Sequence, residues 1–342
     1  MSTNPKKLPA TCCPPPARRA FTLVEMLVVI TIIGILAALG TVAVFQALAA
    51  AKKARIKAEI TNLESAMQQY KTQYKDFPPS YFGPWRLDDG VTIVEVTDDR
   101  HPVRRHLASA FPRIQEPTGA SGTWEKLRNK KLSGANALVF WLQGFSKNVT
   151  LPLSGPGGPL STSGEIAPLF DFDKTRLTND SNGNPVYLPQ GSTVPYQYLA
   201  AQSYLAHAMY DPSNPAPACP YLLEPWDTKG PTGLSVGSNA SMSDVVLDAS
   251  NNAVPGTFQS FAKLCANPKS FQLIAAGLDN DFGSYNSSTS SVGSAQAKNG
   301  SGTNCQIWYK SYSSGAGYDR GGADDDNLTN FSEKSLGDAR PQ

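Results

Sequence analysis

The sequence predicts an α+β protein in which one long N-terminal helix precedes a loop-rich globular part. Residues 54–74 contain neither Gly nor Pro and are rich in Ala, Lys, Glu and Gln, which are strong helix formers, and they follow a long apolar run. The rest of the chain holds most of the 28 Gly and 27 Pro, while the hydrophobic content of the whole chain is 40%. This composition predicts a core joined by long turns and insertions, with an antiparallel β-sheet on which the helix packs.

The first half of the helix, residues 21–45, is a predicted membrane span. It contains one ionisable residue, Glu25, and its length matches the roughly 20 residues that a membrane-crossing helix needs. A carboxylate in lipid costs roughly 2.5–3.5 kcal/mol, so a lone acid inside a span indicates a function and a partner. The alternative is that Glu25 only reaches back to the membrane surface.

The second half, residues 46–76, is predicted to be amphipathic. Its apolar side chains recur every three or four residues and form the stripe expected of a helix that covers a sheet. They are Ile56, Ile60, Leu63, Met67, Tyr70 and Tyr74. The run Asp76-Phe77-Pro78-Pro79 ends the helix, because proline cannot continue its hydrogen-bond ladder. At 1.5 Å per residue, a helix from Phe21 to Asp76 is about 84 Å long.

Residues 77–342 are predicted to form the globular domain, and their patterns are short. Strand patterns occur at 91–96, 194–201 and 270–276. Helix patterns occur at 123–129 and 135–144. Segments rich in Gly, Pro, Ser or Asn are expected to be irregular, and they are 151–163, 211–217 and the flexible insertion 284–302.

The start of the apolar run carries a specific motif, Arg18-Arg19-Ala20-Phe21-Thr22-Leu23-Val24-Glu25. This stretch resembles the prepilin cleavage and methylation site of type IV pilins and of the pseudopilins of type II secretion. The resemblance implies that prepilin peptidase cuts the Ala20–Phe21 bond, that residues 1–20 are a cytoplasmic leader, and that the new Phe21 amine is methylated. The chain departs from the family at Ala20, where Gly usually stands, so we expect slower cleavage.

The resemblance also gives Glu25 a role, because this residue matches the acid of the family motif. Cleavage creates a cation at the start of the helix. The Glu25 carboxylate of one subunit can then neutralise the Phe21 amine of its neighbour as helices stack into a filament. In this interpretation the acid, which is unfavourable in lipid, sets the register of assembly.

The family further implies a lollipop-shaped pilin-like fold and a location. The chain would cross the bacterial inner membrane once, with its C-terminal domain in the periplasm or outside the cell in an assembled filament. Positive charges do not decide the orientation, since basic residues lie on both sides of the span, Lys6, Lys7, Arg18 and Arg19 before it and Lys52, Lys53, Arg55 and Lys57 after it. The apolar run is longer than the roughly 7–15 residues of a signal-peptide core, which argues against an ordinary secretory signal. The implied partners are prepilin peptidase and methylase, other pilin or pseudopilin subunits, and the inner membrane.

Two acidic turns near the C-terminus form the strongest candidate metal site. Asp279 and Asp281 follow a predicted strand, and Asp324, Asp325 and Asp326 form the second turn. Ca²⁺ takes roughly six to eight oxygen ligands in flexible geometry. The pair of turns resembles the calcium loop of the major pseudopilin, which implies that these aspartates bind Ca²⁺ and favours the secretion branch of the family. The alternative is a pair of solvated turns, separated here by an insertion far longer than in small pseudopilins.

Other patterns are weaker. Residues 171–184 contain part of an EF-hand spacing, but no Glu closes the loop, so a turn is expected. Residues 232–237 fit the Gly-x-Ser-x-Gly pattern of serine hydrolases, yet no helix pattern follows them. The histidines are His101, His106 and His207, and the first two precede Ser235, although the serine enzyme fold places its His last. Cys219, Cys265 and Cys305 lack zinc-finger spacing, so a disulfide among them is expected, with its pairing left open.

Together these features predict a structural subunit and not an enzyme. We expect a type IV pilus-like filament or a type II secretion pseudopilus as the assembly. The alternative is a membrane-anchored enzyme or binding protein that uses the prepilin-type helix only as an anchor. The net charge of +2, with 17% charged residues, implies no nucleic-acid partner.

Overall fold

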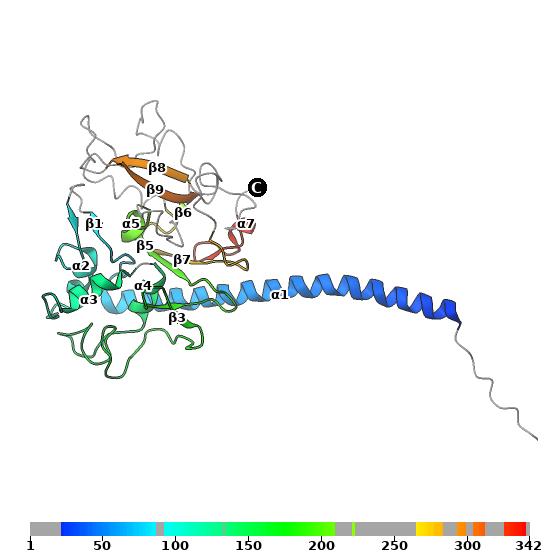
Figure 1. Cartoon of the computed structure of the whole chain (residues 1–342), viewed down its shortest axis with the longest axis horizontal. Coiled ribbons are helices and arrows are strands. Elements are labelled where there is room, and N and C mark those ends of the chain that lie inside the picture. The colour runs from blue at the N-terminus through cyan, green and yellow to red at the C-terminus, as the bar shows by residue number, and fades with distance from the viewer. Residues whose placement is uncertain are drawn as a thin grey trace, which may run out of the picture. The chain divides into compact units, whose positions relative to one another are not determined.

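The computed structural model describes residues 22–86, 92–132, 134–208, 221–222, 265–282, 293–298, 304–311 and 325–339. The chain divides into two compact units, Met1–Ala50 and Ala51–Gln342. The architecture is α+β, with one long N-terminal helix, several short helices and small sheets that are mainly antiparallel (Figure 1). The predicted fold class is therefore confirmed.

Helix α1 (Leu23–Tyr74) is the longest element, with 52 residues. In the first unit its large apolar side chains are exposed, from Leu23 at 82% to Leu48 at 57%. Among the described residues it is the one helix that is long and apolar enough to cross a membrane. A helix that is apolar on all sides is stable in lipid or against other apolar surfaces, but not in water.

In the second unit, α1 buries the predicted apolar stripe. Each of the stripe residues is at most 9% exposed, and Ala66 joins them. The helix ends at Tyr74, two residues before the predicted end, where Lys75 adopts a left-handed φ of 76°. The carboxylate of Asp76 then accepts the Phe77 backbone N–H at 2.7 Å, which starts the turn into Pro78.

The remaining elements are short. The helices are α2 (Pro102–Ala110), α3 (Thr123–Lys130), α4 (Gly134–Leu142), the 3₁₀ turn η1 (Ala201–Ser203), α5 (Tyr204–Ala208) and α7 (Leu336–Ala339). The strands are β1 (Trp85–Arg86), β2 (Ile93–Val94), β3 (Leu177–Asn179), β4 (Pro185–Tyr187), β5 (Gln197–Ala200), β6 (Tyr221–Leu222), β7 (Phe271–Ala275), β8 (Gly293–Lys298), β9 (Asn304–Ser311) and β10 (Leu328–Thr329). They form the sheets β1-β2, β3-β4, β10-β7-β5 and β6-β9-β8, and only the β6–β9 pair among these is parallel.

One hydrophobic core joins α1, α4 and the antiparallel sheet β10-β7-β5. Every residue of α4, β5 and β7 is buried, which is why these segments read as nearly continuous apolar runs. The Tyr198 hydroxyl donates to the Pro78 carbonyl at 2.6 Å, and the Trp141 indole N–H donates to the Pro79 carbonyl at 2.8 Å. These two bonds hold the end of α1 against β5 and α4.

Most predicted elements are present. The helices predicted at 123–129 and 135–144 are α3 and α4, and the strands predicted at 194–201 and 270–276 are β5 and β7. The strand predicted at 91–96 is present only as the two residues of β2. The prediction of a flexible insertion over 284–302 is wrong in part, because β8 lies inside it and pairs with β9. Residues 211–217 lie outside the described residues.

Candidate functional site

The carboxylate of Glu25 closes the start of α1. Its Oε2 accepts the Thr22 backbone N–H at 2.9 Å and the Thr22 hydroxyl at 2.8 Å, while the Glu25 N–H donates to Thr22 Oγ1 at 3.2 Å. This reciprocal arrangement is a capping box, which satisfies N–H groups that the first turn of a helix leaves unpaired. The Thr-x-x-Glu spacing of a capping box is present in the sequence, but only an assembly role was predicted for Glu25.

The surroundings of Glu25 are apolar. Leu23, Val24 and Met26 are 82%, 68% and 54% exposed. Among the described ion pairs, none involves Glu25. Ala20 and Phe21, the residues of the predicted cleavage, lie outside the described part of the chain. The helix therefore begins with a carboxylate beside the position where cleavage would create a cation.

Residues 15–41 match the prokaryotic N-terminal methylation motif, which is the prepilin-type motif. The chain carries a prepilin-type N-terminus. The motif indicates a type IV pilin-like or pseudopilin precursor, and it implies processing by prepilin peptidase and association with a membrane. It suggests a structural subunit rather than an enzyme. The resemblance recognised at residues 18–25 is thereby confirmed, whereas searches of curated proteins and of solved structures return no match.

The two acidic turns of this prepilin-type chain meet beyond the paired strands β7 and β10. The carboxylate of Asp326 accepts hydrogen bonds from the backbone N–H groups of Leu278 and Asp279, the latter at 3.4 Å. The side chain of Asn327 accepts the Gly277 N–H at 3.3 Å. A Cβ at Gly277 would collide with the Asp326 carboxylate, so this close approach requires glycine. The predicted pairing of the two turns is thus present between Asp326 and the first turn.

Asp326 is an incompletely satisfied oxygen donor. Its Oδ1 is buried and has no hydrogen-bond partner among the described residues. Burial raises the pKa of Asp326, and the nearby charge of Asp279 adds to that rise, although the bond from Leu278 opposes it. A buried carboxylate oxygen without a partner is unfavourable, and a bound cation would stabilise it. Carboxylate oxygens such as those of Asp326 and Asp279 are the type of ligand that Ca²⁺ takes.

The other predicted ligands contribute less. The Asp281 backbone N–H donates to Asp279 Oδ1 at 2.9 Å, and the Asp325 carbonyl accepts the Gly337 N–H at 2.6 Å. Asp324 lies outside the described residues. In the part of the chain that the structure describes, no group of three or more His, Cys, Asp or Glu side chains gathers as a metal site. Calcium binding therefore stays a prediction, with Asp326 and Asp279 as its best placed donors.

The weaker acidic segment is a turn, as predicted. Asp180 lies between β3 and β4, and its Oδ1 accepts the N–H groups of Asn182 and Asn184 at 2.8 Å each. Its Oδ2 accepts the Asn136 side-chain amide at 2.6 Å. Because protein donors occupy both oxygens, Asp180 holds a hairpin turn and anchors it to α4.

The three histidines are core residues. His101, His106 and His207 are 0%, 7% and 6% exposed. His207 Nε2 lies 2.8 Å from the Ser80 hydroxyl, and burial lowers the pKa of His207 to about 3. Both side chains of this Ser–His contact are buried in the core of the described residues. Ser235, from the Gly-x-Ser-x-Gly pattern, lies outside the described residues.

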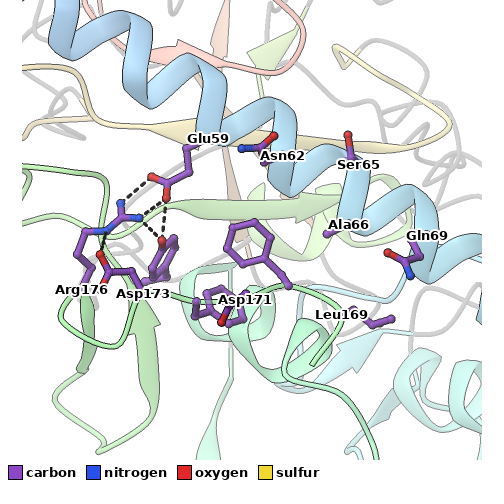
Figure 2. A pocket seen from close by; sticks show the side chains of 12 residues that line it. Glu59, Asn62, Ser65, Ala66, Gln69, Leu169, Asp171, Asp173 and Arg176 are labelled. Carbon is purple, nitrogen blue, oxygen red and sulfur yellow. Dashed lines mark hydrogen bonds and ion pairs between the residues drawn. The ribbon is translucent and has the colours of Figure 1, made fainter. Parts of the chain in front are cut away.

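A polar cluster on the second half of α1 was missed by sequence reasoning. The Arg176 guanidinium binds both carboxylate oxygens of Glu59, with Nη1 2.7 Å from Oε2 (Figure 2). The hydroxyls of Tyr187 and Tyr196 each donate to Glu59 at 2.7 Å. Asp173 accepts from Arg176 at 3.3 Å on the other side. No pattern signals this cluster, because Glu59 and Arg176 are 117 residues apart.

Proposed function

We propose that this chain is a structural subunit of a type IV pilus-like filament or of a type II secretion pseudopilus. The observation that carries the proposal is a prepilin-type motif at residues 15–41 joined to a helix whose apolar side chains are exposed from Leu23 to Leu48. Such a surface needs lipid before assembly. Like helices from other subunits would cover it after assembly.

In this proposal prepilin peptidase cuts between Ala20 and Phe21, and a methylase modifies the new Phe21 amine. The capping box supports a role for Glu25, because it holds the carboxylate against Thr22, the residue that follows the new N-terminus Phe21. A carboxylate there interacts favourably with the positive end of the helix dipole and with a cationic amine. Pairing of Glu25 with the Phe21 amine of a neighbouring subunit would neutralise both charges in lipid.

We also propose that the leader, residues 1–20, faces the cytoplasm and that the second unit lies in the periplasm, or outside the cell in an assembled filament. In the secretion branch, Ca²⁺ would be held by Asp326 and Asp279, with Asp281, Asp324 and Asp325 as further oxygen donors. The bound ion would supply the partner that the buried Asp326 Oδ1 lacks. The support is the contact between the two turns, which Asp326 already makes with the first turn.

The test of processing is the intact mass and N-terminal sequence of the full chain, expressed with and without an active prepilin peptidase. With the peptidase we expect a mature chain that begins at methylated Phe21, and without it a chain that keeps residues 1–20. The Ala20→Gly variant restores the usual family residue and should be cleaved faster. A membrane form that keeps its leader beside an active peptidase would refute the proposal.

A further inference from the structure

A groove of about 590 Å³ runs beside the second half of α1, between the helix and residues 169–176 (Figure 2). Its volume falls within the range of small-molecule sites, roughly 300–1,000 Å³. All residues that line the groove belong to the second unit, and none belongs to the predicted membrane span. Neither the prepilin motif nor the acidic turns account for it.

The charged side chains at one end of the groove are already engaged. Arg176 is bound by Glu59 and Asp173, and it is only 20% exposed. An anionic ligand would therefore have to compete with two carboxylates for one guanidinium. Glu59 in turn accepts bonds from Arg176, Tyr187 and Tyr196, so it offers little to a cation.

Three polar side chains along the groove remain available. Asn62, Gln69 and Asp171 are exposed, and none of them has a hydrogen-bond partner among the described residues. Asn62 and Gln69 are two helical turns apart, about 10.5 Å along α1. This spacing is long enough for two linked sugar rings. Two amides and a carboxylate provide both donors and acceptors, which is what neighbouring hydroxyl groups require.

The wall opposite the helix is aromatic. Phe170 is half-buried, and its ring packs edge-on against Phe172 with centroids 4.9 Å apart. Phe172 is buried and packs in the same way against Tyr187 at 5.0 Å. Phe170 is therefore a supported apolar surface beside polar groups, a combination that suits the C–H face of a sugar ring.

We propose that this groove binds a neutral oligosaccharide, with two linked sugar units between Asn62 and Gln69 and one ring against Phe170. Asp171 would accept hydrogen bonds from sugar hydroxyls. A small cation fits less well, because Asp171 is the one carboxylate of the groove that holds no other group, and an exposed single ion pair is weak.

The test is a titration of the full chain, in a detergent without a sugar head group, with a panel of neutral disaccharides. The panel contains α- and β-linked dimers of glucose, galactose, mannose and N-acetylglucosamine. Saturation-transfer NMR measures the binding of each one. We expect at least one disaccharide to bind, and Asn62→Ala or Gln69→Ala to weaken binding about fivefold, the effect of one lost hydrogen bond. Gln68→Ala is the matched control, because Gln68 is exposed on the same helix and does not line the groove.

Oligomers of two to six units of the sugar that binds will identify the source of the ligand. Affinity that rises with length indicates a polysaccharide, and constant affinity indicates a free disaccharide. Binding that Gln68→Ala weakens as much as Gln69→Ala would overturn the proposal. So would a panel without a binder, or a groove that binds putrescine and none of the sugars.

Discussion

At the residue scale, Glu59 shows how the fold keeps a half-buried acid ionised. Burial raises the pKa of Glu59, but the hydrogen bonds from Arg176, Tyr196 and Tyr187 outweigh that effect, and the pKa lies below its usual 4.5. Because the folded-state pKa is depressed, the contribution of the cluster to stability is fully present above the unfolded-state pKa of Glu59, near 4.5. This contribution is lost as the pH falls through the folded-state pKa.

Replacing Glu59 by Ala should destabilise the second unit by about 3 kcal/mol, because it leaves the Arg176 guanidinium without its main partner in a mostly buried site. Urea unfolding of the detergent-solubilised chain measures this change. The control is Glu125→Ala, which breaks an ion pair whose Arg128 is 45% exposed and should cost less than about 1 kcal/mol. Equal losses from both variants would show that the Glu59 cluster contributes no more than a surface pair. The acid sensitivity below about pH 4.5 should also be smaller in Glu59→Ala.

Glu25 makes two contributions that substitution can separate, a helix cap and a charge. Glu25→Gln keeps the capping box, since Gln serves in it as Glu does, but removes the charge. Glu25→Val removes both. If the charge pairs with the Phe21 amine, both variants should insert into membranes as well as the wild type or better and lose filament or secretion yield. Membrane fractionation measures insertion, and filament or secretion yield measures assembly. Assembly of Glu25→Gln at the wild-type level would mean that Glu25 acts only as a helix cap.

At the scale of elements, the sequence was most informative where a pattern is long. The stripe from Ile56 to Tyr74 spans several helical turns, and all of it is buried. The proline pair after the stripe predicted an end at Asp76, two residues beyond the observed end of α1 at Tyr74. By contrast, β1, β2 and β10 have two residues each, too few to show a period. The turn of the β3–β4 hairpin is a local feature held by Asp180, but its anchor to α4, the bond from Asn136 to Asp180, joins residues 44 apart and has no local pattern.

The acidic turns between β7 and β10 predict that Ca²⁺ stabilises the fold. Calcium at about 100 times its Kd should stabilise the fold by roughly 2.7 kcal/mol and raise the melting temperature, because the ion binds only the folded turns. Melting scans of the full chain in EDTA and in excess Ca²⁺ measure the shift. Asp326→Asn and Asp279→Ala should each abolish it, whereas Asp171→Asn should leave it intact.

A wild-type midpoint that Ca²⁺ does not move would make the acidic turns ordinary surface loops, and the case for the secretion branch would weaken with them. A shift that persists in Asp326→Asn would place the ion elsewhere. Gly277→Ala provides an independent check, because the added methyl group would displace the Asp326 carboxylate without changing any charge.

At the scale of the whole molecule, features built from residues close together in the chain could be predicted from the sequence, and features built from distant residues could not. The prepilin-type motif is local, so residues 18–25 sufficed to recognise it. The groove beside α1 is built from residues 59–69 and 169–187, which only the fold brings together. The capping box at Thr22 and Glu25 is local as well, but it lies inside the prepilin-type motif, and the two patterns share Glu25.

The division into two units predicts where the chain can be cut. A fragment that begins at Ala51 keeps the entire buried stripe of α1 and should be soluble and folded. A fragment that begins at Glu64 lacks Ile56, Ile60 and Leu63, each at most 2% exposed in the core. Losing that burial should remove about 5–9 kcal/mol, which is comparable with the whole stability of a typical domain. Circular dichroism and urea unfolding should therefore show a cooperative transition for the longer fragment and none for the shorter. A shorter fragment as stable as the longer one would mean that the first turns of the stripe are dispensable, and that the second half of α1 is not an integral part of the core.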